Sequence, residues 1–193
     1  MRQLADIKEK EIIENQNQSE SKNTKKGSFF KELFIDVAIV AAIAFCVWKF
    51  VGYGVWITSG SMIPTLEVKD RLIVERVHNT NKLNYGDIVL FKNDEYGDDI
   101  LIKRLIGKPG DTIVINNGIV YRNGEKLDEP YVKNNENYNG VFKVPENEFF
   151  FLGDNRANSA DSRYWKDPYV NADDIEGKAI FRYYPFDEMG KLN

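Results

Sequence analysis

The sequence predicts a mainly β domain, built as an antiparallel β-sheet structure, behind one N-terminal transmembrane helix. Two observations support this fold class. One long apolar run lies near the N-terminus, and the remaining chain alternates apolar and polar residues in short segments separated by turn residues. A length of 193 residues suits one domain plus an additional segment. We therefore expect a polar tail over residues 1–31, a membrane helix over 32–57 and a β domain over 58–193.

The composition excludes several classes of function. The chain has 26 basic and 30 acidic residues, giving a net charge of −4, and this balance does not indicate a nucleic-acid-binding surface. The single cysteine, Cys46, rules out an intrachain disulfide. With one histidine, His78, the sequence also argues against a metal centre of the usual ligand types. We expect no nucleic-acid partner, no metal and no cofactor.

The apolar run LFIDVAIVAAIAFCVWKFVGYGVWI, residues 33–57, predicts a membrane span. It has the length needed to cross a hydrocarbon core about 30 Å thick. Its distal end is rich in aromatic residues, and lysines precede its start, so the positive-inside rule places the N-terminus in the cytoplasm and the β domain outside. Asp36 and Lys49 interrupt the run, which leaves a buried core helix as an alternative.

The residues that follow read as strands. Segments rich in β-branched and aromatic residues are separated by Asn-Gly and Pro-Gly turns. The expected strand segments are Arg71–Val77, Asp87–Lys92, Ile100–Gly107, Thr112–Leu127, Glu148–Asp154 and Ala179–Pro185. Two polar segments, residues 93–99 and 132–140, read as exposed loops.

Two parts of the chain carry residues suited to nucleophilic chemistry: the segment before the first expected strand, and the expected strand that contains Lys103. TSGSMIPTL, residues 58–66, places serine hydroxyls on a tight turn, although a serine needs a base before it can attack. Nothing around His78 supports that role, so Lys103 is the alternative base. A lysine accepts a proton only where burial favours its neutral form. Strand alternation places Lys103 and Arg104 on opposite faces, and a solvent-facing Lys103 remains the simpler reading.

A third cluster is polar. FLGDNRANSADSR, residues 151–163, follows an expected strand and holds several charged and hydroxyl side chains. Such a stretch is either an ordinary salt-bridged loop or the support that orients a nearby site.

Taken together, three motifs identify a resemblance. SGSMxPT, KRxIGxPGD and GDNRxNSxDSR occur in this order after one apolar run. This pattern resembles the bacterial type I signal peptidases, the Ser-Lys membrane peptidases that remove secretory signal peptides, in their compact Gram-positive-like form. The resemblance implies a mainly β catalytic domain of the signal-peptidase type, without cofactor, which forms an acyl-enzyme.

The resemblance also implies roles for single residues. Ser61 matches the nucleophile and Lys103 the general base, while Ser59 matches the oxyanion-hole hydroxyl and Ser159 the serine that hydrogen-bonds and orients the lysine amine. Five charged residues match a supporting network. Two ion pairs are expected in it, Arg104 with Asp154 and Asp161 with Arg163, and Arg156 belongs to the same network with a less certain partner.

The implied substrates are signal peptides of secretory preproteins, cut after an A-x-A type site. The residues that match the lining of the substrate pockets are Ile57, Thr58, Met62, Leu66, Leu101 and Ile102. Thr58 stands where some members have proline, which affects only the rigidity of the loop. The implied surroundings are the lipid bilayer of the plasma membrane, with the secretion translocon nearby.

Two other readings are open. A self-cleaving Ser-Lys repressor shares the dyad, but such proteins carry an N-terminal DNA-binding domain, where this chain has a polar tail and an apolar run. A catalytically silent, membrane-anchored binding module is the second alternative. Such relics usually lose the serine or the lysine, and this chain has both Ser61 and Lys103.

Overall fold

The computed structural model describes residue 31 and residues 33–46 and 52–192. The chain divides into two compact units, residues 1–48 and 49–193. In the first unit, residues 33–46 form a helix with exposed side chains. No helix in these described stretches is both long and apolar enough to cross a membrane. Residues 32 and 47–51 of the expected membrane helix lie outside the described residues.

The expected helix does not reach residue 57, and this boundary is corrected. Strand β1 (Gly52–Trp56) pairs antiparallel with β2 (Arg71–Arg76). Tyr53 and Val55 pack against a buried cluster, whereas Gly54 and Trp56 are exposed, which is the two-residue period of a strand. A Cβ on Gly52 would lie 2.4 Å from the carbonyl oxygen of Val74, so the pairing needs glycine there.

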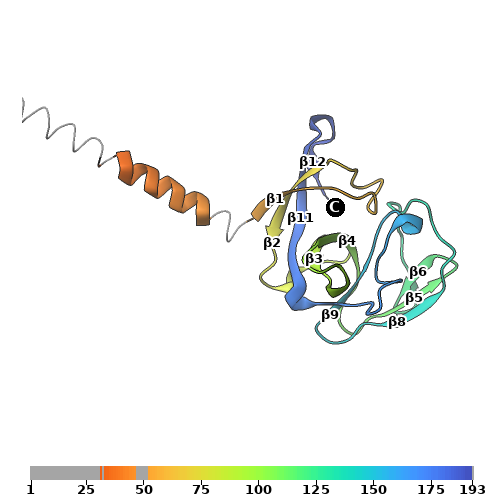
Figure 1. The fold of residues 1–193 in the computed structure, drawn as a ribbon. Coiled ribbons are helices and arrows are strands. Elements are labelled where there is room, and N and C mark those ends of the chain that lie inside the picture. The colour runs from red at the N-terminus through yellow and green to blue at the C-terminus, as the bar shows by residue number, and fades with distance from the viewer. Residues whose placement is uncertain (1–30, 32, 47–51, 193) are drawn as a thin grey trace, which may run out of the picture. The chain divides into compact units, whose positions relative to one another are not determined.

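The larger sheet has eight strands. The order is β1-β2-β11-β3-β4-β9-β10, with β12 paired to β11, and every named ladder is antiparallel (Figure 1). Besides β1 and β2, its strands are β3 (Ile88–Lys92), β4 (Ile100–Gly107), β9 (Glu148–Leu152), β10 (Val170–Asn171), β11 (Ile175–Tyr184) and β12 (Gly190–Lys191). The strand β11 lies between β2 and β3, far from both in sequence.

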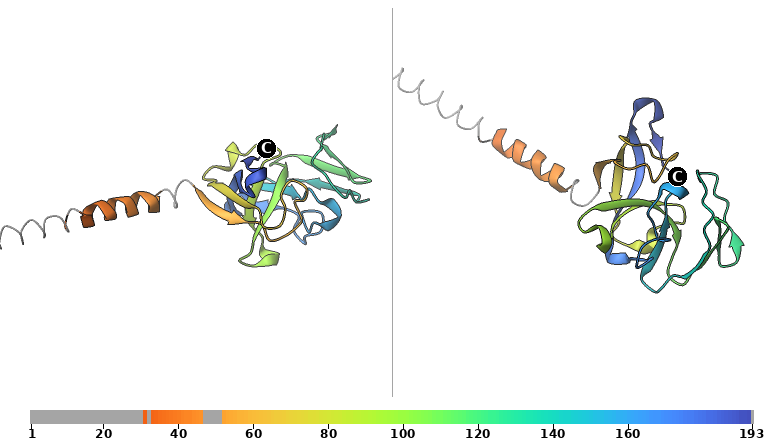
Figure 2. Two further views of the ribbon diagram at one scale, coloured as in Figure 1. Left: turned by 90° about the horizontal axis from the view of Figure 1, so that it is seen from above. Right: turned by 45° about the vertical axis from the view of Figure 1, so that its right-hand side comes forward.

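A second, four-stranded sheet lies to one side of the first, as both views of Figure 2 show. Its order is β7-β6-β5-β8. The strands are β5 (Thr112–Asn116), β6 (Ile119–Arg122), β7 (Glu125–Lys126) and β8 (Gly140–Lys143). Short 3₁₀ turns connect strands in the domain: η1 (Thr80–Lys82), η2 (Asp94–Tyr96), η3 (Arg156–Asn158), η4 (Ala172–Asp174) and η5 (Phe186–Glu188).

The six expected strand segments all contain strands, with shifted ends. The segment 112–127 divides into β5, β6 and β7 at its two Asn-Gly turns. The last segment begins earlier than expected, because residues 175–178 also pair with β3. Strand β8 begins at the end of the expected loop 132–140.

Three buried clusters fill the domain, and one of them supports the turn that follows β1. This cluster contains Ile57, Met62 and Leu66 together with Leu72, Val74, Ile88, Leu90 and Ala179. Met62 and Leu66 have no exposed surface. The turn is therefore anchored by the burial of Met62 and Leu66 in this cluster.

Candidate active site

The Ser-Gly-Ser turn is a closed loop with a rigid base. The backbone N–H of Ile57 donates to the carbonyl of Asp70 at 2.8 Å, and that of Lys69 donates to Ile57 at 2.8 Å. Arg182 of β11 pairs with the Asp70 carboxylate at 2.9 Å and donates to the carbonyl of Thr65 at 3.4 Å. The loop that carries Ser61 is thus tied at its base to the C-terminal part of the domain.

Lys103 lies against Ser61. The Nζ atom of Lys103 is 2.9 Å from Ser61 Oγ and donates to the carbonyl of Ile102 at 3.1 Å. The side chain of Lys103 is 4% exposed and that of Ser61 is 7% exposed. The solvent-facing reading of Lys103 is therefore wrong.

Lys103 and Arg104 alternate along β4, as expected, and both faces of the strand are covered. The turn that carries Ser61 lies against Lys103, and the Asp154 carboxylate and the Tyr131 ring lie against Arg104. Arg104 is therefore also buried, with 2% exposed. Both residues therefore have polar partners inside the domain.

Burial lowers the pKa of Lys103 from 10.5 to about 8, and the charge of Asp161 partly opposes this effect. Desolvation penalises the charged ammonium, so the neutral amine is populated near neutral pH. A neutral amine has a lone pair that can accept the proton of the Ser61 hydroxyl. The contact of 2.9 Å is within the reach that proton transfer requires.

Two hydroxyls lie near the pair. Ser59 is exposed, with its Oγ 3.4 Å from Ser61 Oγ. Ser159 is 6% exposed, and its Oγ makes no hydrogen bond with any described residue. The expected bond from Ser159 to the lysine amine is therefore not formed in this structure, because Lys103 instead contacts Ser61 and Ile102.

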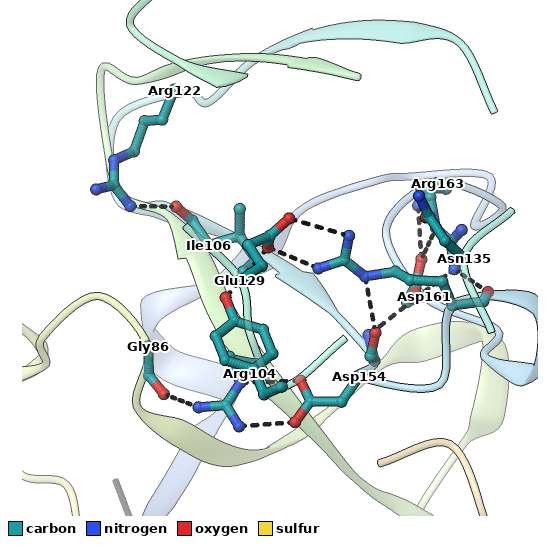
Figure 3. A network of polar contacts seen from close by, with 12 residues as sticks. Gly86, Arg104, Ile106, Arg122, Glu129, Asn135, Asp154, Asp161 and Arg163 are labelled. Atoms are coloured by element: carbon teal, nitrogen blue, oxygen red, sulfur yellow. Dashed lines mark hydrogen bonds and ion pairs between the residues drawn. The ribbon is translucent and has the colours of Figure 1, made fainter. Parts of the chain in front are cut away.

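The polar cluster after β9 is a network of ion pairs, shown in Figure 3. Arg104 Nε and Nη2 donate to the two carboxylate oxygens of Asp154 at 2.8 and 2.7 Å. Arg163 donates to both oxygens of Asp161 at 2.8 and 2.9 Å. Asp161 also accepts from the backbone N–H of Gly153 at 2.9 Å. Two-point pairs of this kind fix orientation as well as charge.

The partner of Arg156 is Glu129, which precedes β8 and was not singled out in the sequence. Arg156 Nη2 is 2.7 Å from Glu129 Oε1, and Arg156 Nε donates to the carbonyl of Gly153 at 3.0 Å. This pair joins the loop after β9 to the segment between β7 and β8.

Asn155 is a site residue that the sequence analysis missed. Its backbone N–H donates to the Ser61 carbonyl at 3.0 Å, and its Nδ2 donates to the Gly60 carbonyl at 2.9 Å. Its Oδ1 accepts from Asn134 and Asn158 at 2.8 and 3.1 Å, which sets the orientation of the amide. Asn155 therefore holds the two carbonyls that flank the nucleophile. The only signal in the sequence was its position between two charged residues of the polar cluster.

A hollow of about 710 Å³ lies along β1 and β4, with Ser59 and Lys103 in its wall. Four of the expected pocket residues line it: Ile57, Thr58, Leu101 and Ile102. The other two, Met62 and Leu66, do not, because they are fully buried in the cluster beneath the turn. The prediction that Met62 and Leu66 line the pocket is therefore wrong, and both residues instead support the turn that carries Ser61.

The described residues contain no group of three or more His, Cys, Asp or Glu side chains that could hold a metal ion. His78, the only histidine, is exposed after β2 and lines neither the hollow nor the Ser61–Lys103 contact. The chemistry that the site offers is therefore that of a hydroxyl and a buried amine.

A serine hydroxyl beside a buried lysine amine, next to a hollow, defines the class of a serine peptidase. The comparison with known proteins specifies it further. The family model described as signal peptidase, peptidase S26, matches residues 30–184. The chain belongs to this family, and it is a serine endopeptidase. Membership supports signal-peptide cleavage and implies a membrane-anchored enzyme.

Similar proteins come from cyanobacteria and from Gram-positive bacteria. Signal peptidase I of Leptolyngbya laminosa is 39% identical over 165 residues, covering 81% of this chain and 80% of its own. Signal peptidase I S of Bacillus subtilis is 35% identical over 187 residues, covering 90% and 99%. A crystal structure of a signal peptidase I from Enterococcus faecalis is 35% identical, with a TM-score of 0.44, and covers 50% of this chain and 96% of that chain.

Proposed function

We propose that this chain removes N-terminal signal peptides from secretory preproteins with a Ser61–Lys103 dyad, cutting after small residues at an A-x-A type site. The observation that carries the proposal is the 2.9 Å contact between Lys103 Nζ and Ser61 Oγ in a site where the lysine is 4% exposed. The lowered pKa of Lys103, about 8, supports it, because the base must be neutral to begin the reaction.

Acylation begins with the attack of Ser61 Oγ on the carbonyl carbon of the residue before the cut. Lys103 Nζ takes the hydroxyl proton as the new C–O bond forms. The tetrahedral intermediate then collapses, the C–N bond breaks, and Lys103 returns the proton to the leaving amine. The product is an ester between Ser61 and the signal peptide.

The negative oxygen of the intermediate needs hydrogen-bond donors. The backbone N–H of Ser61 donates no hydrogen bond to any described residue, so it is available for this purpose. The Ser59 hydroxyl, 3.4 Å from Ser61 Oγ, is a second donor. Removing one such donor typically lowers kcat by about 10²–10³.

Deacylation uses the same base. Lys103 takes a proton from water as the water oxygen attacks the ester carbonyl. The bond from that carbon to Ser61 Oγ then breaks, and Lys103 returns the proton to Ser61 Oγ. We propose that Ser159 orients the lysine amine at this stage. Its buried Oγ has no partner among the described residues, and a hydrogen bond to the lysine amine would satisfy it.

The substrate is proposed to bind as an added strand. β1 is the terminal strand of the larger sheet, and the hollow separates it from β4. An extended peptide in this hollow can bond to backbone groups of the strands beside it. Ile57, Thr58, Leu101 and Ile102 leave room for small side chains at positions −1 and −3.

The proposed location is the plasma membrane. Residues 1–31 face the cytoplasm, the apolar run before Gly52 anchors the chain, and the catalytic domain is extracytoplasmic, close to the secretion translocon. Anchoring confines enzyme and precursor to one surface and raises their effective concentration. Protease treatment of intact cells and of inverted membrane vesicles tests this: the catalytic domain must be degraded only in the intact cells, after removal of the wall.

The first experiment is cleavage of one secretory precursor by the detergent-solubilised full chain, with mass spectrometry of the products. Wild type is compared with Ser61→Ala, Lys103→Ala and Asn81→Ala, the last altering an exposed residue of η1. We expect one cut after an A-x-A site in wild type and Asn81→Ala and none in the dyad variants.

Two results would contradict the proposal. A cut that survives in Lys103→Ala would mean that another group is the base. If wild type does not cut in either lipid or detergent, the chain is a silent binding module, and precursor would then bind without turnover.

A further inference from the structure

A second hollow adjoins the dyad. It has a volume of about 330 Å³, against about 710 Å³ for the hollow along β1. Its lining residues are Ser59, Gly60, Ser61, Tyr96, Leu101, Lys103, Asn155, Asn158 and Ala160. Ser59, Leu101 and Lys103 line both hollows, so Lys103 lies where the two spaces meet, and Ser61 lines the smaller one.

The two hollows have different walls. The larger one is bounded by the strands β1 and β4 and ends at Tyr183 and Arg71. The smaller one is bounded by the turn η2, which supplies Tyr96, and by the loop after β9, which supplies Asn158 and Ala160. No residue of β1 lines the smaller hollow. The two hollows therefore lie against different elements of the domain and share Lys103.

The smaller hollow contains a hydrogen-bonding group that the domain does not use. Asn158 is exposed, and its Nδ2 donates to Asn155 Oδ1 at 3.1 Å. That bond fixes the amide, and its Oδ1 accepts no hydrogen bond from the described residues. Tyr96 is 38% exposed and adds an aromatic surface. An oriented acceptor beside a ring suits a peptide segment with one backbone N–H to satisfy and one side chain to pack.

The reaction supplies such a segment. A cut peptide bond yields an acyl half, which stays on Ser61, and an amine half. The amine nitrogen must lie within reach of Lys103 Nζ, since that atom returns the proton as the C–N bond breaks. The larger hollow is already assigned to the residues before the cut. Lys103 also lines the smaller hollow, and Ser61 lines only that one, so the amine half has a second space within reach of Lys103 Nζ.

We propose that the smaller hollow binds the first residues of the mature chain, on the amine side of the cut, with Asn158 and Tyr96 as the specificity-determining contacts. This inference rests on the proposed function. A segment of one or two residues fits, because an extended chain rises about 3.3 Å per residue and the space is less than half the larger hollow. The mature sequence beyond the second residue then has little influence on the rate.

The test uses two substrates that share the same residues before the cut. One continues with five residues of mature sequence, and the other ends in an aminocoumarin amide, which has no amino acid after the cut. For each enzyme the ratio of kcat/KM for the peptide to kcat/KM for the coumarin amide is measured. The variants are Tyr96→Ala and Asn158→Ala, with Asn81→Ala as the control on an exposed 3₁₀ turn.

We expect the ratio to fall about fivefold to tenfold in Tyr96→Ala and in Asn158→Ala and to stay at the wild-type value in Asn81→Ala. A wild-type ratio in both site variants would overturn the proposal. Equal losses on both substrates would do the same, because they would mean that the residues act on the dyad itself. A failure of the proposed function would look different, since wild type would then cut neither substrate.

A partition experiment gives an independent readout. Alanyl-alanine amide is added while the acyl-enzyme turns over, and it competes with water for the ester at Ser61. The amine attacks the ester carbonyl, the C–O bond breaks, and a new peptide bond forms. We expect wild type to form this transfer product and Tyr96→Ala to form several-fold less of it. An unchanged yield in Tyr96→Ala would contradict binding in the smaller hollow.

Discussion

Lys103 and Arg104 are neighbours on β4, and both are buried cations, yet their surroundings differ. Arg104 has a carboxylate, Asp154, bonded at two points on its own face of the sheet. Among the described residues, Lys103 makes hydrogen bonds with the Ser61 hydroxyl and the Ile102 carbonyl, and with no carboxylate. Because Arg104 is paired with a carboxylate, it stays charged and has a structural role. Because Lys103 is buried without a bonded carboxylate, its pKa is lowered and it can act as a base. One face of β4 therefore carries a structural ion pair, and the other carries the proposed catalytic amine.

The largest effect on activity is expected when Lys103 is replaced by arginine, the residue type of its neighbour Arg104. In Lys103→Arg the guanidinium stays charged at all accessible pH values and cannot accept a proton. We expect precursor cleavage to fall by about 10³-fold or more, measured as kcat/KM. A loss below about tenfold would show that Lys103 is not the base. The control, Lys92→Arg, changes an exposed lysine of β3 and should retain activity.

Removing the counterion tests the other face. In Asp154→Asn, Arg104 keeps its charge in a buried position without a carboxylate, and such losses reduce the free energy of unfolding by about 3–5 kcal/mol. We expect a clear fall in Tm, measured by circular dichroism on the full chain in detergent. By contrast, Lys103→Met removes an amine without a direct counterion, so its Tm should equal or exceed that of wild type. A lower Tm in Lys103→Met would contradict the comparison.

Asn155 tests the support of the nucleophile without touching either cation. Asn155→Ala removes the amide that holds the Gly60 carbonyl, so the turn loosens around Ser61. We expect kcat on the aminocoumarin amide, which has no residue after the cut, to fall about tenfold to a hundredfold with KM within about twofold, because Asn155 lines the smaller hollow and not the larger one. The pH profile should keep its wild-type midpoint. A shifted midpoint would mean that Asn155 acts on the pKa of Lys103.

The pH dependence follows from the lowered pKa of Lys103, about 8. Below that value most of the lysine is protonated, so kcat/KM should fall about tenfold for each pH unit and level off above pH 8. The stability of the folded domain should also rise with pH. Between about pH 8 and the unfolded value of 10.5, the unfolded chain binds the extra proton, so the free energy of unfolding rises with pH. Lys103→Met should lack this rise, and an activity profile flat from pH 5 to 9 would contradict the assignment.

The smallest effect is expected for an exposed ion pair near the same sheet. Lys92 and Glu176 are 3.8 Å apart, with side chains 45% and 33% exposed. Solvent screens such pairs, so Lys92→Ala should change stability by less than about 0.5 kcal/mol. A change comparable to that of Asp154→Asn would mean that burial does not decide the difference between the cations.

The strands could be predicted from the sequence, because alternation and Asn-Gly turns are local signals. β1 could not, since its residues continue an apolar run and only pairing with β2 distinguishes strand from helix. The dyad residues were identified through motif resemblance. The burial of both Lys103 and Arg104 could not be predicted, because it depends on segments distant in sequence that cover the two faces of β4, the turn with Ser61 and the loop with Asp154. The support from Asn155 and the burial of Met62 are tertiary in the same sense.

The position of β11 has a consequence for the time at which the enzyme becomes competent during synthesis. The hairpin β1–β2 carries the nucleophile turn and β3–β4 carries the lysine, and β11 is the strand that lies between them in the sheet. Until residues 175–184 have left the ribosome, the two hairpins have no shared neighbour to bring them into register. A nascent chain therefore carries both reactive groups from residue 103 onward, and cannot use them until β11 has been added. Proteolytic activity begins only when nearly all of the domain has been made.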